Sequence, residues 1–152
     1  MKLAEALTIR ADLKKRIYQL KERLLLNAKV QEGEQPSENP EDLLKELNIN
    51  FMEFEKYIKQ INKTNNVTKC NNKTLTDLIA ERDVLIMNIG IKRDFLKSAS
   101  EKIDRYSNKE VKILSTINIS EKQKEIDSLS KKLRELDVKI QELNWTTELI
   151  EE

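Results

Sequence analysis

Residues 126–143 read IDSLSKKLRELDVKIQEL, and this stretch carries the clearest indication of the fold. Apart from Val138, its apolar side chains recur at alternating steps of three and four residues, a spacing typical of a coiled-coil seam. The seam consists of Ile126, Leu129, Leu133, Leu136, Ile140 and Leu143. A helix with one narrow apolar stripe needs partner helices to cover it, so we expect the rest of the chain to supply them.

Three other stretches repeat this spacing. We therefore predict an all-α protein, an up-down bundle of four long helices with coiled-coil-like packing in one domain spanning residues 1–152. The predicted helices span residues 2–31, 40–62, 75–105 and 120–144. The chain has two glycines and two prolines in 152 residues, which suits long helices better than a fold with many tight turns.

The apolar rows predict which helix faces are buried. In the second helix, the predicted inward row is Leu44, Leu47, Phe51, Phe54, Ile58 and Ile61. In the first helix, Leu7, Tyr18, Leu25 and Leu26 form a second stripe beside the main one. This second stripe predicts a helix that touches more than one neighbour.

Capping residues place the helix ends. Asn39 as N-cap and Pro40 at the first helical position begin the second helix. Gly33 can end the first helix as a left-handed cap. Ser120 and Gln123 match a capping box that would open the fourth helix.

Two stretches do not follow the helical spacing. Residues 62–74 are polar and contain AsnAsn at 71–72, which predicts a loop or a short hairpin. Residues 110–117 alternate polar and β-branched side chains and predict a short extended strand or hairpin. The partner of that strand is either residues 67–70 or the same strand of another subunit.

The charges are balanced overall and divided locally. With 28 basic and 27 acidic residues, the chain has a net charge of +1 and no global attraction to nucleic acid, so we expect no nucleic-acid partner. Residues 1–31 hold eight Lys/Arg and three Asp/Glu, a net charge of +5. Residues 32–60 hold three Lys/Arg and eight Asp/Glu, a net charge of −5, which favours an antiparallel hairpin of the first two helices.

The same sequence features predict a cytoplasmic protein. Its one cysteine, Cys70, cannot form an internal disulfide, and Glu5 and Asp12 interrupt what a signal peptide would need as an apolar region. No apolar run approaches the roughly 18 residues of a membrane span, so membrane association is not expected.

The residues of common catalytic sites are missing. The chain has no histidine, and its two glycines, Gly33 and Gly90, form no nucleotide-binding loop. Cys70 has no base near it in sequence and is interpreted as an incidental thiol. We therefore expect no enzyme activity, no cofactor and no bound metal.

Four residues are candidates for interaction. Arg10, Arg82 and Lys92 interrupt the apolar rows, either because they fix packing and register or because they bind carboxylates or an anionic ligand inside the bundle. Trp145 is the one tryptophan, and it either packs at a contact between subunits or covers the end of the chain's own bundle. Gly90 within the third helix marks either a close helix crossing or an ordinary surface position.

Several segments resemble a known bacterial family. They include NAKVQEGE at 27–34, LTDLIAERD at 75–83 and NWTTEL at 144–149. Nearly the whole chain is similar to a family of uncharacterised helical proteins whose members often carry the label septicolysin. That resemblance implies a helical fold and, through the label, a pore-forming activity, and it implies no catalytic residue.

Two functions follow as hypotheses. The first is a cytoplasmic, self-associating helical scaffold or adaptor, which acts as a homo-oligomer through its surfaces. The alternative is a membrane-active protein that uses its basic first helix against anionic lipid.

Overall fold

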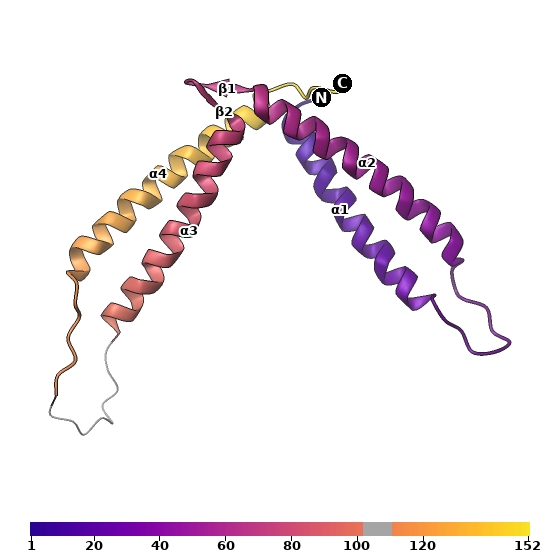
Figure 1. Ribbon diagram of the computed structural model, residues 1–152, viewed down its shortest axis with the longest axis horizontal. Helices are drawn as coiled ribbons and strands as arrows, with labels where there is room; N and C mark the ends of the chain where they lie inside the picture. Colours follow the sequence, from indigo (N-terminus) through magenta and orange to yellow (C-terminus); the bar gives the residue numbers. More distant parts are fainter. Residues whose placement is uncertain (102–110) are drawn as a thin grey trace. The chain divides into compact units, whose positions relative to one another are not determined.

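The computed structural model describes residues 1–101 and 111–152 (Figure 1). Within these residues, the regular structure consists of four long helices and one two-stranded antiparallel hairpin. The helices are α1 (Leu3–Leu26), α2 (Pro40–Val67), α3 (Leu75–Ser100) and α4 (Ile119–Thr146), and the strands are β1 (Lys69–Cys70) and β2 (Lys73–Thr74). The predicted all-α class with four long helices is confirmed.

The chain divides into two compact units. The first unit contains Met1–Leu75 and Gln141–Glu152, and the second contains Thr76–Ile140. In the first unit, α1 and α2 form an antiparallel helical hairpin, and in the second unit α3 and α4 form another (Figure 1). That one bundle encloses residues 1–152 as a single domain stays a prediction.

The α1–α2 hairpin buries a row of apolar side chains on facing sides of its helices. Six of them are at most 4% exposed: Leu3, Ala6, Leu13, Leu20, Leu43 and Ile61. The predicted inward row of α2 is confirmed at Ile61 but wrong at Leu44 and Phe51, which remain 41% and 47% exposed. The buried row instead includes Asn50 and Thr64, whose polar side chains made the row hard to recognise in the sequence.

Asn27 ends α1 five residues earlier than predicted. Its side-chain amide donates to the carbonyl of Arg23 at 2.8 Å, and its side-chain oxygen accepts from the backbone N–H of Glu38 at 3.0 Å. The Arg23 guanidinium also pairs with the Glu38 carboxylate, with Nε donating to Oε2 at 3.0 Å. These contacts satisfy the groups at the helix end and fasten it to the segment before α2.

Gly33 has the expected left-handed backbone, with φ +87, but it does not cap α1. It lies in a turn of the connection, where the N–H of Glu34 donates to the carbonyl of Gln31 at 2.9 Å. The predicted start of α2 is confirmed, because the side chain of Asn39 accepts from the N–H of Glu41 at 3.0 Å and Pro40 is the first helical residue. The helix continues beyond the predicted end, to Val67.

The predicted short hairpin within residues 62–74 is confirmed. Cys70 pairs with Lys73, and the two residues between them, Asn71 and Asn72, have φ values of 50 and 66. Two consecutive left-handed residues define the turn type that best fits the twist of paired strands, and asparagine tolerates that conformation. AsnAsn at 71–72 therefore explains why the chain reverses here.

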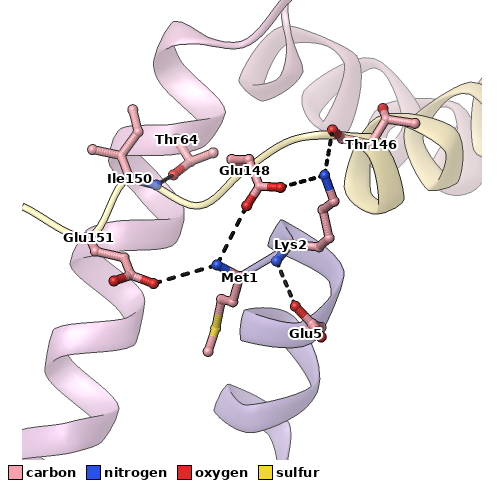
Figure 2. Close-up of polar contacts among 8 residues, drawn as sticks. All are labelled: Met1, Lys2, Glu5, Thr64, Thr146, Glu148, Ile150 and Glu151. Atoms are coloured by element: carbon pink, nitrogen blue, oxygen red, sulfur yellow. Dashed lines mark hydrogen bonds and ion pairs between the residues drawn. The ribbon is translucent and has the colours of Figure 1, made fainter.

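The two chain ends meet in the first unit, in an arrangement that we call the terminal clasp, residues 1–3 with 147–151 (Figure 2). Leu3 N–H donates to Thr147 O at 2.9 Å, and Leu149 N–H donates to Met1 O at 2.9 Å. The Lys2 ammonium pairs with the Glu148 carboxylate, and its hydrogen bond lowers the pKa of Glu148. Leu149 is 7% exposed, so the clasp also contributes to the core.

Thr64 connects α2 to this clasp. It is fully buried, and its hydroxyl donates to Gln60 O at 2.8 Å while accepting from the backbone N–H of Ile150 at 3.0 Å (Figure 2). The side-chain amide of Gln60 in turn donates to the carbonyl of Glu151 at 2.8 Å. The segment after α4 is therefore held by side chains of α2 as well as by the first residues of the chain.

The second unit has a mainly apolar core. The buried cluster of α3 and α4 contains Leu85, Ile89, Leu96 and Ile126, with Ile117, Ile119, Leu129 and Leu133 packed against it. Ile126 and Ile140 of the predicted seam are 3% and 1% exposed. The inward face predicted from residues 126–143 is therefore confirmed for this unit.

The third helix and the predicted strand of the second unit differ from the sequence prediction. The third helix ends at Ser100, and the rest of its predicted range, 102–105, lies outside the described residues, as does residue 110. Residues 111–117 of the predicted strand pair with no strand among the described residues. Ile117 packs against the helical core instead, which explains one apolar position of the alternating pattern.

Asn118, not Ser120, caps α4. Its side-chain oxygen accepts from the N–H of Glu121 at 3.1 Å, and its backbone carbonyl accepts from the N–H of Lys122 at 3.1 Å. The predicted capping box of Ser120 with Gln123 is therefore wrong by two residues. Asparagine is as strong an N-cap as serine, so the sequence offered two candidates within one turn.

Candidate interaction surfaces

The described surface offers helix faces rather than a cluster of reactive groups. Within residues 1–101 and 111–152, no group of three or more Cys, Asp or Glu side chains could hold a metal ion. Over the same residues, every helix is too short or too polar to span a membrane. The features that remain are two exposed apolar surfaces, one on each unit.

The first surface is an open groove along the α1–α2 hairpin. It is lined by Ile17, Tyr18, Lys21, Leu24, Leu25, Leu47 and Phe51, and we call it the α1–α2 groove. Tyr18 and Leu25 are 58% and 63% exposed, although both belong to the second apolar stripe predicted for α1. Two packed helices can bury only the sides that face each other, so the neighbouring apolar rows stay open.

The second surface lies on α3. Val84, Met87, Ile91 and Phe95, which we call the α3 stripe, follow one another at steps of three and four residues, and each is at least 51% exposed. The buried row of the same helix contains Leu85, Ile89 and Leu96. Helix α3 is therefore apolar on two faces, and α4 covers one of them.

Arg82 lies partly buried between α3 and α4. Its side chain is 27% exposed, and one guanidinium nitrogen is 3.8 Å from a carboxylate oxygen of Asp137 on α4. Another nitrogen donates to Asp83 at 3.3 Å, although adjacent residues of a helix lie on different faces. The arginine side chain is long enough to bend back, so Arg82 joins the two helices by charge, and its binding of an anionic ligand stays a prediction.

Lys92 and Arg10 occupy different places. Lys92 is exposed and lines a shallow groove with Phe95, Lys122 and Glu125, so its predicted position inside the apolar row is wrong. Arg10 is partly buried on α1 in the first unit. The predicted basic residues therefore do not form one site: at about 1.5 Å per residue, even Arg82 and Lys92 are roughly 15 Å apart along α3.

Trp145 lies near the end of α4 with 62% of its surface exposed. Buried Leu149 fills the core nearby in sequence. Most of the Trp145 side chain is therefore open to solvent, and its covering of the end of the bundle stays a prediction. Its role at a contact between subunits stays a prediction.

Two exposed apolar positions of α2 were missed by sequence reasoning. Leu44 and Phe51 were assigned to the core, while the structure leaves them exposed beside α1. The α3 stripe was missed as well, because only one apolar row was predicted for this helix. The available signal was the apolar run from Val84 to Met87, which a helix with a single buried face does not require.

This geometry defines a class of protein: helical, built from two αα-hairpins, with apolar helix faces as its main surface feature. The chain belongs to the DUF6847 family of unknown function, whose model matches residues 10–149. The chain is also similar to a solved structure of a functionally unknown conserved protein from Corynebacterium diphtheriae. The two are 40% identical, with a TM-score of 0.93 over 99% of each chain.

No curated protein matches the chain. The resemblance proposed from the sequence is supported as far as a family of functionally unknown proteins and a similar conserved bacterial protein of known structure. Neither description carries the septicolysin label. The function must therefore be argued from the surfaces.

Proposed function

We propose that this protein is a non-enzymatic helical scaffold or adaptor of the cytoplasm that self-associates through its apolar helix faces. The observation that carries this proposal is the α3 stripe. A helix with apolar rows on two faces needs neighbours on both, and large exposed apolar patches mark interaction sites. The groove and Trp145 add apolar surface of the same kind.

The magnitudes favour a contact that combines several of these surfaces. Fully burying one large apolar side chain contributes about 1.5–3 kcal/mol, and the four residues of the α3 stripe are only partly exposed. Association costs about 4–15 kcal/mol in lost freedom of motion. The α3 stripe alone therefore supports weak binding, and a stable assembly requires further surface.

Sedimentation velocity over a wide range of concentrations tests the proposal. We expect the wild-type protein to form a defined oligomer at high micromolar concentration and to dissociate on dilution. Met87→Gln with Ile91→Gln should shift it toward monomer without loss of helical circular dichroism. The matched control is Ile49→Gln, because Ile49 is 60% exposed on α2 and lies outside both surfaces.

Trp145→Ala gives a second measurement. Exposed aromatic residues are enriched among the residues that dominate binding energy, so we expect this variant to shift toward monomer without unfolding. If it keeps the wild-type assembly state, the interface role of Trp145 is wrong. If the wild-type protein is monomeric at high micromolar concentration, the self-association proposal fails.

The membrane-active alternative rests on the resemblance and on the charge of α1, which holds six Lys/Arg and three Asp/Glu. Basic helices with exposed apolar side chains bind anionic membrane surfaces. Flotation with liposomes that contain or lack anionic lipid separates the two functions. The scaffold proposal expects the protein to stay at the bottom of both gradients.

A further inference from the structure

We propose that the α1–α2 groove is closed by the same groove of a second copy, so that two hairpins form an antiparallel four-helix bundle about a two-fold axis parallel to the helices. This inference rests on the proposed self-association and names one of its surfaces, with the partner and the symmetry of that contact. In this arrangement, α1 of one copy lies against α2 of the other.

The first argument is the spacing of the exposed side chains. Tyr18 and Leu25 on α1 are seven residues apart, and so are Leu44 and Phe51 on α2. Seven residues of helix span roughly 10.5 Å. The helices are antiparallel, and Tyr18 and Phe51 line the same groove, so Tyr18 lies at the level of Phe51. By the same spacing, Leu25 lies at the level of Leu44.

A two-fold axis parallel to the helices keeps these levels unchanged in the second copy. Tyr18 then meets Phe51 of the other copy, and Leu25 meets Leu44. The symmetry makes each contact twice. Cross-helix pairs of aromatic and aliphatic side chains would thus cover four residues that each hairpin leaves 41–63% exposed.

The second argument is charge. Lys14 precedes Tyr18 by one helical turn, and Glu55 follows Phe51 by one turn, so the two residues share a level at the end of the apolar contact. The proposed packing places the Lys14 ammonium of one copy near the Glu55 carboxylate of the other. Within its own chain, Glu55 pairs with Lys59 on the exposed side of α2. The second copy would extend that pair into a network of alternating charges.

Charge also selects the direction of the axis. A two-fold axis perpendicular to the helices would place α1 against α1, with its six basic and three acidic residues facing the same set. Like charges brought together across an interface are unfavourable. The parallel axis instead places α1 against α2, which holds five acidic and four basic residues.

Disulfide trapping between two single-cysteine chains tests the geometry. In a Cys70→Ser background, one chain carries Tyr18→Cys and an affinity tag, and the other carries Phe51→Cys. After mixing under mild oxidation, we expect the disulfide between the two different chains in several-fold excess over either disulfide between like chains. An excess of Tyr18→Cys homodimer would overturn the parallel axis.

A charge exchange provides an independent readout on the same interface. Lys14→Glu should weaken the dimer several-fold in sedimentation, and adding Glu55→Lys to the same chain should restore it. Lys15→Glu is the matched control, because Lys15 is exposed on α1 but points away from the groove row. Equal weakening by Lys14→Glu and Lys15→Glu, with no rescue, would contradict the inference.

The outcomes distinguish this inference from the proposed function. A wild-type protein that self-associates but gives no disulfide between the two chains retains the proposed function and loses this interface. A wild-type protein that is monomeric at all concentrations contradicts both.

Discussion

The two helical hairpins reach similar structures by different means. The α3–α4 hairpin has an apolar cluster of Leu85, Ile89, Leu96 and Ile126, with Arg82 as its charged cross-link. The α1–α2 hairpin also has an apolar row, but its ends depend on polar contacts, by Asn27 at one end and by the terminal clasp at the other. The difference teaches that an apolar seam can set the pairing of helices, whereas polar side chains set where helices stop.

The largest expected effect is on the apolar hairpin. Ile126→Ala should lower the free energy of unfolding by about 2–5 kcal/mol, because it removes a side chain that is 3% exposed at the centre of the cluster. Urea denaturation measures this change. Leu133→Ala is the graded comparison, since Leu133 is only partly buried and should cost less. A larger cost for Leu133 would mean that the core is centred elsewhere on α4.

The next effect concerns the polar end of the first hairpin. Asn27→Ala should cost about 1–2 kcal/mol, because it removes the cap of α1 and leaves the Glu38 N–H without its partner. Thermal unfolding compares it with Asn48→Ala, an exposed asparagine on α2. Equal stability of the two variants would show that the segment between α1 and α2 keeps its structure without the side chain of Asn27.

A smaller change of opposite sign is expected on α3. A Cβ added at Gly90 meets nothing within 4 Å, so the close helix crossing considered from the sequence is wrong and the position is an ordinary surface one. Gly90→Ala should stabilise the protein by about 0.5–1 kcal/mol through helix propensity. A loss of stability on thermal unfolding would reveal a neighbour at Gly90, such as a subunit contact.

The smallest effect is the pH dependence of the polar contacts. The hydrogen bond from Lys2 lowers the pKa of Glu148, so this pair stabilises the fold above the usual glutamate pKa of about 4.3 and stops doing so as the pH falls through the lowered pKa. At neutral pH, the backbone amide hydrogens of Leu3 and Leu149 should therefore exchange with solvent faster in Glu148→Gln than in the wild type. The difference should disappear in acid. If the exchange rates still differ at a pH below the pKa of Glu148, the substitution acts through packing and not through the charge of Glu148.

Part of this structure could be predicted from local sequence. The seam at 126–143, the cap formed by Asn39 and Pro40 and the turn at Asn71 and Asn72 depend on residues within a few positions of one another, and all three are confirmed. The row in α2 could not be decided locally. Leu43 and Leu44 are adjacent and chemically equivalent, so only packing against α1 shows which of them is buried.

The candidate surfaces divide in the same way. The second stripe of α1, with Tyr18 and Leu25, followed from the sequence, but the exposure of Leu44 and Phe51 on α2 did not. A basic residue in an apolar row predicted a position between two helices. This holds for Arg82, whose side chain reaches Asp137, but not for Lys92, which is exposed. A polar residue in a helical row can pair across the interface or rotate out of it, and spacing alone does not distinguish the two.

The terminal clasp has a consequence for the order in which the protein folds. It joins Leu3 to Thr147, 144 positions apart, whereas each hairpin joins neighbouring helices. Contacts between distant residues form late because a long loop must close first. On the ribosome, residues 147–151 emerge after α1, α2, α3 and α4. The second unit ends at Ile140 and can close before them, so the unit that is started first during synthesis is the one that is completed last.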